Sequence, residues 1–187
     1  KTHPITKRYI LHDWVKNQLK NYLPETIARE AKLRHAAYYL PILNTAREDI
    51  SKGGQKAREG FQLFHREWAN IQAGLNRVSK NSVEGKKAAE LFNSYMVAGA
   101  ELLPFHYFPK ECRSFLEMGL KVSQRLSQKN IEALHLLNLG MFHSSQKKYV
   151  EAEEYLEQAQ QLASTLKDVQ TEGKILNEIA KLYLTKD

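Results

Sequence analysis

The chain has 187 residues, of which 42% are hydrophobic and 26% charged, a balance typical of a folded domain and unlike that of a wholly disordered chain. No stretch approaches the roughly 18 consecutive apolar residues of a membrane-spanning helix, and no basic segment leads into an apolar one as in a secretory signal. The net charge of +7 is concentrated in residues 1–80, which carry 15 Lys and Arg against 7 Asp and Glu.

The first predicted elements are short strands, and helical patterns follow them along the chain. Residues 5–11 are β-branched and aromatic, which favours one or two small strands. Asp13 stands in an N-cap-like place before apolar residues at helical spacing. Pro24 opens a long helical pattern in which Pro41 predicts a kink or break. Two consecutive glycines make residues 51–54 the clearest linker.

Helical periodicity resumes between Phe61 and Val78, and a turn is predicted at residues 81–85. From Lys86 to the end the pattern is helix, turn, helix, turn without a convincing strand. The aromatic run 105–108 lies between two prolines, and we expect it to be a turn whose rings pack into the first of these helix pairs. The sequence therefore predicts an all-α chain with a small β remnant at its N-terminus.

Comparison of the chain with itself reveals an internal repeat of about 40 residues. A shift of 40 pairs Phe115-Leu116-Glu117 with Tyr155-Leu156-Glu157 and Leu136 with Leu176. It also pairs small residues with small ones, such as Gly119 with Ala159. Stacked helix pairs need this pattern, because small residues allow neighbouring helices to approach closely and large ones fill the remaining space.

One unit resembles the tetratricopeptide repeat. It has Leu-Gly in its first helix within residues 136–140, a Tyr at position 149, and then Ala152, Leu156 and Ala159. His143 departs from that pattern, since a Tyr is usual there. The preceding unit matches more loosely, and the following one, 173–187, has only a first helix. The resemblance implies a right-handed α-solenoid of helix hairpins.

The N-terminal half resembles another known arrangement. Residues 9–15, Tyr-Ile-Leu-His-Asp-Trp-Val, are similar to the end of the winged helix in STAND-class signal-transduction NTPases, the NB-ARC-related group. Residues 25–80 resemble the helical linker that follows it, including the runs 34–40 and 67–75. The resemblance implies the C-terminal part of such a protein, and the start at Lys1 without Met suggests a fragment of a longer chain.

The chain is accordingly divided into three regions: a winged-helix remnant over 1–23, a helical linker over 24–85 and a tetratricopeptide-like solenoid over 86–187. The STAND resemblance implies an autoregulatory or sensor role beside an NTPase domain, which would be a partner within the parent chain. No phosphate-binding loop occurs in these residues, so we expect neither ATP binding nor hydrolysis by this chain.

Catalytic and metal-binding patterns are weak. Cys112, the only cysteine, is more consistent with a packed thiol than with a nucleophile, and a single cysteine fits a cytoplasmic, reducing location. His135 and His143 are eight residues apart but lack a third nearby ligand. The carboxylates of residues 151–157 are best explained as a solvated helix face. The sequence predicts a protein that is not an enzyme and has no cofactor or metal.

In a tetratricopeptide solenoid the first helix of each pair lines a concave groove. The 40-residue register then predicts a mixed apolar and polar groove for a peptide or helical protein partner. Spacer packing alone is an equally good reading of these positions. The predicted groove residues are Val97, Glu101, Leu137, Asn138, Met141, Ser144, Ser145, Asn177, Glu178 and Lys181.

Two further hypotheses remain open. The basic first 80 residues could bind nucleic acid through phosphate contacts from Lys7, Arg8, Lys16 and Lys20, although no complete recognition helix accompanies them. Alternatively, the chain could be a self-associating scaffold and form oligomers, because a solenoid that ends within a repeat exposes an apolar face.

Overall fold

The structure is a computed structural model that describes residues 22–82 and 85–186. Over these ranges the chain is all-helical, with seven α-helices, one 3-10 turn and no strand, which confirms the predicted all-α class there. Most of the predicted winged-helix remnant, including the strands expected at 5–11, lies outside the described residues. The elements are α2 (Glu25–Ser51), α3 (Gly54–Asn81), α4 (Lys86–Gly99), η1 (Leu103–Phe105), α5 (Pro109–Arg125), α6 (Lys129–Ser145), α7 (Tyr149–Leu166) and α8 (Val169–Lys186).

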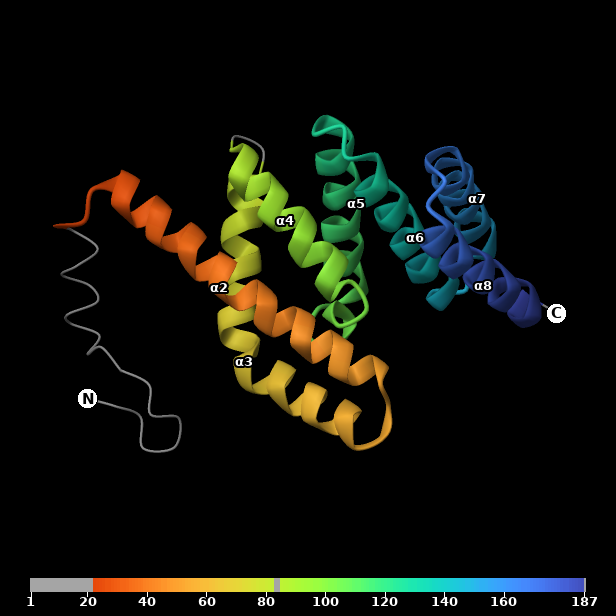
Figure 1. Ribbon diagram of the computed structural model, residues 1–187, viewed down its shortest axis with the longest axis horizontal. Helices are drawn as coiled ribbons and strands as arrows, with labels where there is room; N and C mark the ends of the chain where they lie inside the picture. Colours follow the sequence, from red (N-terminus) through yellow and green to blue (C-terminus); the bar gives the residue numbers. More distant parts are fainter. Residues whose placement is uncertain (1–21, 83–84, 187) are drawn as a thin grey trace.

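The two longest helices, α2 and α3, form an antiparallel hairpin at one end of the molecule (Figure 1). The predicted linker is its tight turn, where Gly53 and Gly54 have φ values of 72° and 58°, a region that glycine adopts without steric cost. Gly60 brings the helices together, since a Cβ there would lie 2.7 Å from the carbonyl oxygen of Ala46. The hairpin is therefore closely packed near its turn.

The break predicted at Pro41 does not occur. Helix α2 continues from Glu25 to Ser51 with Pro41 inside it. Pro41 lacks the N–H that would bond the carbonyl of Ala37, but both residues are exposed, so water can satisfy that carbonyl. The Thr45 hydroxyl donates to the Pro41 carbonyl at 3.1 Å, and packing against α3 holds the helix on both sides of the proline.

Helices α5 to α8 are joined by three turns of the same construction. In each turn one non-glycine residue has φ between 54° and 58°. The N–H of the next residue then donates to the carbonyl five residues earlier at 2.9–3.0 Å, which closes the end of the preceding helix. The three turn residues are Ser127, Lys147 and Lys167. Their 20-residue spacing makes one helix with its turn the unit, and two such units give the 40-residue period.

Small residues allow the helices of this stack to approach closely. A Cβ on Gly119 of α5 would lie 2.7 Å from the ring of His135 on α6. A Cβ on Gly140 of α6 would lie 2.7 Å from Leu156 on α7. Larger residues at Gly119 and Gly140 would therefore push a neighbouring helix away.

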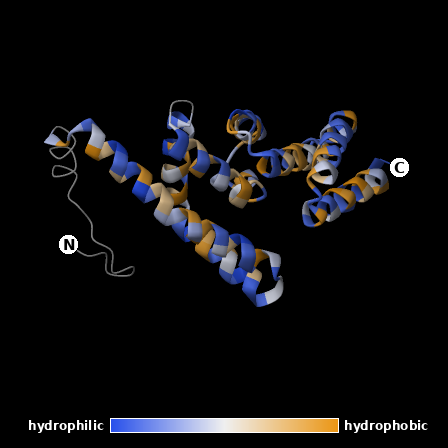
Figure 2. Ribbon diagram, turned by 45° about the horizontal axis from the view of Figure 1, so that its top comes forward, coloured by the Kyte–Doolittle hydropathy of each residue, from blue (hydrophilic) through white to orange (hydrophobic). Residues whose placement is uncertain are grey.

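The core does not divide at the predicted boundary between residues 85 and 86. One apolar cluster runs from α2 and α3 through α4 and α5 into α6, and a second joins α6, α7 and α8. Figure 2 shows apolar residues recurring among polar ones along the helices. The buried Tyr95 hydroxyl of α4 donates to the Ala36 carbonyl of α2 at 2.8 Å. The α2–α3 hairpin and helix α4 thus share one interior.

The aromatic run at 105–108 packs in a different place from the one predicted. The His106 ring stacks on Trp68 of α3, with ring centroids 4.1 Å apart. Tyr107 contacts both Trp68 and Phe115 of α5. Phe105 and Phe108 are 55% and 80% exposed. The segment therefore joins the stack to α3, and only Tyr107 reaches the first helix pair.

None of the helices in the described ranges combines the length and apolarity needed to cross a bilayer.

Candidate partner-binding groove

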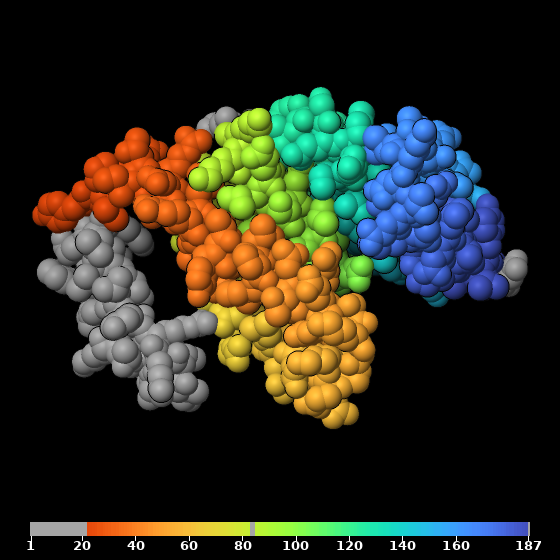
Figure 3. All heavy atoms as spheres, viewed as in Figure 1, coloured from red at the N-terminus to blue at the C-terminus, as the bar shows by residue number. Residues whose placement is uncertain are grey.

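The alternate helices α4, α6 and α8 lie side by side, because α6 contacts both α4 and α8. Their adjoining faces, together with the C-terminal half of α2, line an open pocket of about 180 Å³. Figure 3 shows the surface receding between the α2–α3 hairpin and the α6–α8 end of the molecule. The pocket is lined by Arg47, Val97, Glu101, Leu134, Leu137, Asn138, Met141, Lys174, Asn177 and Glu178. We call this surface the groove.

Seven of the ten residues predicted from the 40-residue register line this pocket. Ser145 lines an adjoining pocket instead. Ser144 is half-buried and Lys181 is exposed, and neither contributes to the lining of the two pockets. Lys181 forms an ion pair with Glu178, at 2.6 Å between Nζ and Oε1.

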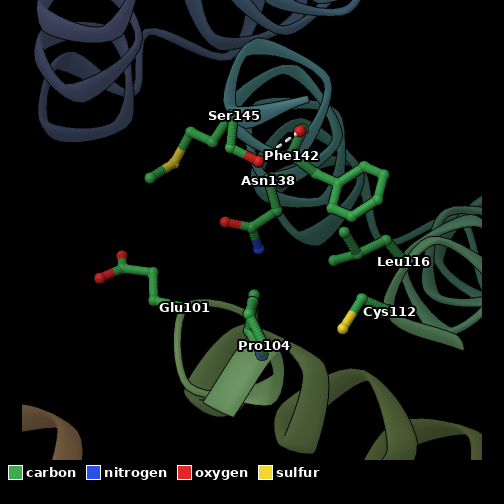
Figure 4. Close-up of a pocket in the computed structure, with 9 residues that line it drawn as sticks. Glu101, Pro104, Cys112, Leu116, Asn138, Phe142 and Ser145 are labelled. Carbon is green, nitrogen blue, oxygen red and sulfur yellow. Dashed lines mark hydrogen bonds between the residues drawn. The ribbon is translucent and has the colours of Figure 1, made fainter. Parts of the chain in front are cut away.

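The adjoining pocket, of about 230 Å³, lies between η1, α5 and α6. It shares Glu101, Asn138 and Met141 with the first, so the two pockets form one continuous hollow. Figure 4 shows the Asn138 side chain pointing into this pocket, with Glu101 and Cys112 on opposite sides of it. The Ser145 hydroxyl donates to the Phe142 carbonyl at 2.7 Å, so its proton is already used within α6. The remaining lining residues are Ala100, Pro104, Leu116 and Phe142.

The groove combines an apolar wall with uncommitted amides. Leu137 is buried, whereas Val97 and Met141 remain partly accessible. Neither the Asn138 nor the Asn177 side chain forms a hydrogen bond with another described residue. A side-chain amide carries both donors and an acceptor, the combination that pairs with a peptide group. The groove can therefore hold a segment that presents main-chain polar groups and apolar side chains.

The charges around the groove are mixed. The Arg47 guanidinium is held at the rim by a hydrogen bond from Nη1 to the Val97 carbonyl, at 3.3 Å. Lys174 adds a second positive charge, and Glu101 and Glu178 supply negative ones. Because neither sign dominates, the groove has no strong preference for an acidic or a basic ligand.

The sequence reading missed three lining residues of the first pocket. Leu134 and Lys174 are 40 residues apart and lie one helical turn before predicted positions, so the same register could have found them. Arg47 comes from α2, outside the repeat, and only the packing of the hairpin on α4 brings it to the groove. No pattern in the sequence predicts that Arg47 lies at the groove.

The cysteine of α5 and the two histidines of α6 are buried. Cys112 is buried, and burial raises the pKa of its thiol above the ordinary value. His135 and His143 are both buried in α6. Within residues 22–82 and 85–186, no three His, Cys, Asp or Glu side chains come close enough to hold a metal ion. Lys7, Arg8, Lys16 and Lys20, named for the nucleic-acid hypothesis, lie outside the described residues.

Comparisons of the chain with protein-family models, with curated proteins and with solved structures gave no match.

Proposed function

We propose that this chain is a non-catalytic interaction module that binds a peptide or protein segment in the groove. The observation that carries the proposal is the convergence of three alternate helices on one hollow that is lined by apolar side chains and two unpaired amides. Asn138 is half-buried and Asn177 is exposed, so both amides are accessible and can pair with the main-chain groups of a bound segment.

The test starts from a peptide selected for binding to the full chain from a random library. Its affinity is then measured by calorimetry for the double variant Met141→Lys and Asn177→Ala. Met141 lines both pockets and Asn177 faces the first from α8. The new charge and the lost amide should weaken binding by at least about tenfold, which corresponds to about 1.4 kcal/mol.

A matched double variant, Val150→Lys with Gln161→Ala, serves as the control. Both residues are exposed on α7 and lie outside the lining of the groove. This variant should keep the parent affinity, and circular dichroism should show equal helicity for all three chains. Equal affinity of the groove variant and the parent would contradict the proposal that the groove binds the peptide. A library that yields no binder would contradict it too.

We further propose that the module is the regulatory arm of a STAND-type NTPase in the cytoplasm, with tetratricopeptide-like helix pairs. The support is the order of resemblances along the chain: Tyr9–Val15, then the linker-like residues 25–80, then the 40-residue units. In this role a ligand in the groove would bias the nucleotide-dependent state of the parent, a coupling between two sites. Sequencing the parent gene upstream of Lys1 tests this idea, because a gene without a phosphate-binding loop there would overturn it and leave the groove proposal intact.

A further inference from the structure

Helix α8 repeats α6 at a distance of 40 residues. The turns that precede the two helices contain Ser127 and Lys167, which share the same left-handed conformation and hydrogen-bond pattern. Each helix packs one face on the helix before it: α6 on α5, and α8 on α7. Residues 40 apart in the two helices therefore occupy equivalent positions.

A second face of α6 is covered by the helix that follows it. This face carries Ala133, Leu136, Gly140 and His143, and all four residues are buried. Helix α7 lies on it, with Leu156 directly over Gly140. The covering helix contributes Ala152, Leu156, Ala159 and Ala163, all fully or almost fully buried.

The equivalent face of α8 is uncovered. It carries Gly173, Leu176, Ala180 and Tyr183, and all four residues are exposed. Leu176 is 47% exposed, whereas its counterpart Leu136 is only 5% exposed. Val169 and Leu184, at 77% and 81%, extend the apolar surface beyond this face.

This pattern is that of a contact surface. Leu176 and Tyr183 are seven residues apart and so share one side of the helix, with small residues beside them where a second backbone can approach. The Tyr183 side chain is also held in place by α7, because its hydroxyl donates a hydrogen bond to the Glu153 carboxylate of that helix at 2.5 Å. Small and large residues thus alternate along this face of α8 in the same order as on the α6 face that packs against α7.

We propose that the exposed face of α8 docks an amphipathic α-helix whose apolar side resembles that of α7, with a large aliphatic residue between small ones. This occupant is inferred from the repeat, because the exposed face of α8 is the 40-residue equivalent of the α6 face that α7 covers. This surface is distinct from the groove, to which α8 contributes Lys174, Asn177 and Glu178. The inference therefore stands without the proposed function.

The probe is the α7 helix of the chain itself. A copy of residues 147–166 is attached directly after Lys186, which is the register equivalent of Gln146 at the α6–α7 turn. Docking should raise the unfolding midpoint of the extended chain by about 4 °C or more, since each kcal/mol moves the midpoint of a chain of this size by about 2–4 °C. The same peptide, labelled and free in solution, should bind the unextended chain in a saturable manner.

Ala180→Arg places a bulky charge in the middle of the face and should abolish both effects. Because Ala180 is exposed, the substitution should leave the unfolding midpoint of the unextended chain unchanged. Thr185→Arg, also exposed on α8 but off the face, should keep the gain. No rise in the extended chain, or an equal rise with Ala180→Arg, would overturn the proposal. Sedimentation that shows a dimer abolished by Ala180→Arg would also overturn it, because the face would then belong to a second copy.

Discussion

The imidazole of His135 sits in a buried polar network between α4 and α6. Its Nε2 lies 3.3 Å from the Asn93 side-chain oxygen, and the Asn93 amide donates to Gln128 at 2.8 Å. The Nδ1 atom has no hydrogen-bond partner among the described residues and lies against Gly119. Burial therefore lowers the pKa of His135 from 6.5 to about 4 and keeps the ring neutral.

This depressed pKa predicts a loss of stability in mild acid. Between about pH 6.5 and 4 the unfolded chain binds the proton and the folded chain does not, so the free energy of unfolding should fall as the pH falls, by about 3 kcal/mol over that range. Burial also lowers the pKa of His35 and His143, which acts in the same direction.

Urea unfolding of the parent and of His135→Gln at two pH values, one neutral and one near the folded pKa, measures this effect. The variant lacks the titrating group and can still bond Asn93, so its stability should drop by about 2–3 kcal/mol less than that of the parent. An identical drop in both chains would show that His135 titrates alike in the folded and unfolded states.

At the scale of the helix, some glycines are required by a close contact with a neighbouring helix and others are not. Gly140 lies where α6 meets α7, and an added methyl would collide with Leu156 at 2.7 Å. Gly173 lies on the exposed face of α8, and an added methyl would meet nothing within 4 Å. The close approach of a neighbouring helix decides which glycine is required.

Gly140→Ala should destabilise the chain by a net of about 1–2 kcal/mol, because overpacking outweighs the better helix propensity of alanine. Gly173→Ala should instead stabilise it by about 0.5–1 kcal/mol, since only the propensity changes. Thermal unfolding of both variants checks the pair. A gain in stability for Gly140→Ala would mean that α6 and α7 can separate without cost.

At the scale of the whole molecule, helices α5 to α8 each contact mainly their sequence neighbours, so stability should differ along the chain. Helices α2, α3 and α4 share one large core, whereas α8 is held by Thr171, Ile175 and Leu182 on one face only. Amide hydrogen exchange should therefore be fastest in α8 and slowest in α3 and α4.

Leu182→Ala tests this gradient. Leu182 is 1% exposed, and its truncation should cost about 2–4 kcal/mol of local stability and speed exchange throughout α8. Exchange in α2 and α3 should remain as in the parent. Equal acceleration in all helices would show that the molecule opens as a single cooperative unit.

The sequence alone determined the features that local interactions set. Apolar spacing of 3.6 residues gave the helices, Gly53 and Gly54 gave the first turn, and the 40-residue match aligned α6 with α8 and predicted seven residues of the first groove pocket. Helical periodicity fixes which side chains share a face, so register could be carried from one unit to the next.

Tertiary packing decided the rest. Contact with α3 kept α2 continuous through Pro41, and the stacking of His106 on Trp68 drew the aromatic run away from the first helix pair. Arg47 entered the groove because the hairpin shares a core with α4, and the second pocket formed where η1, α5 and α6 meet. These contacts join residues far apart in the chain, and their energies depend on shapes that local sequence spacing does not encode.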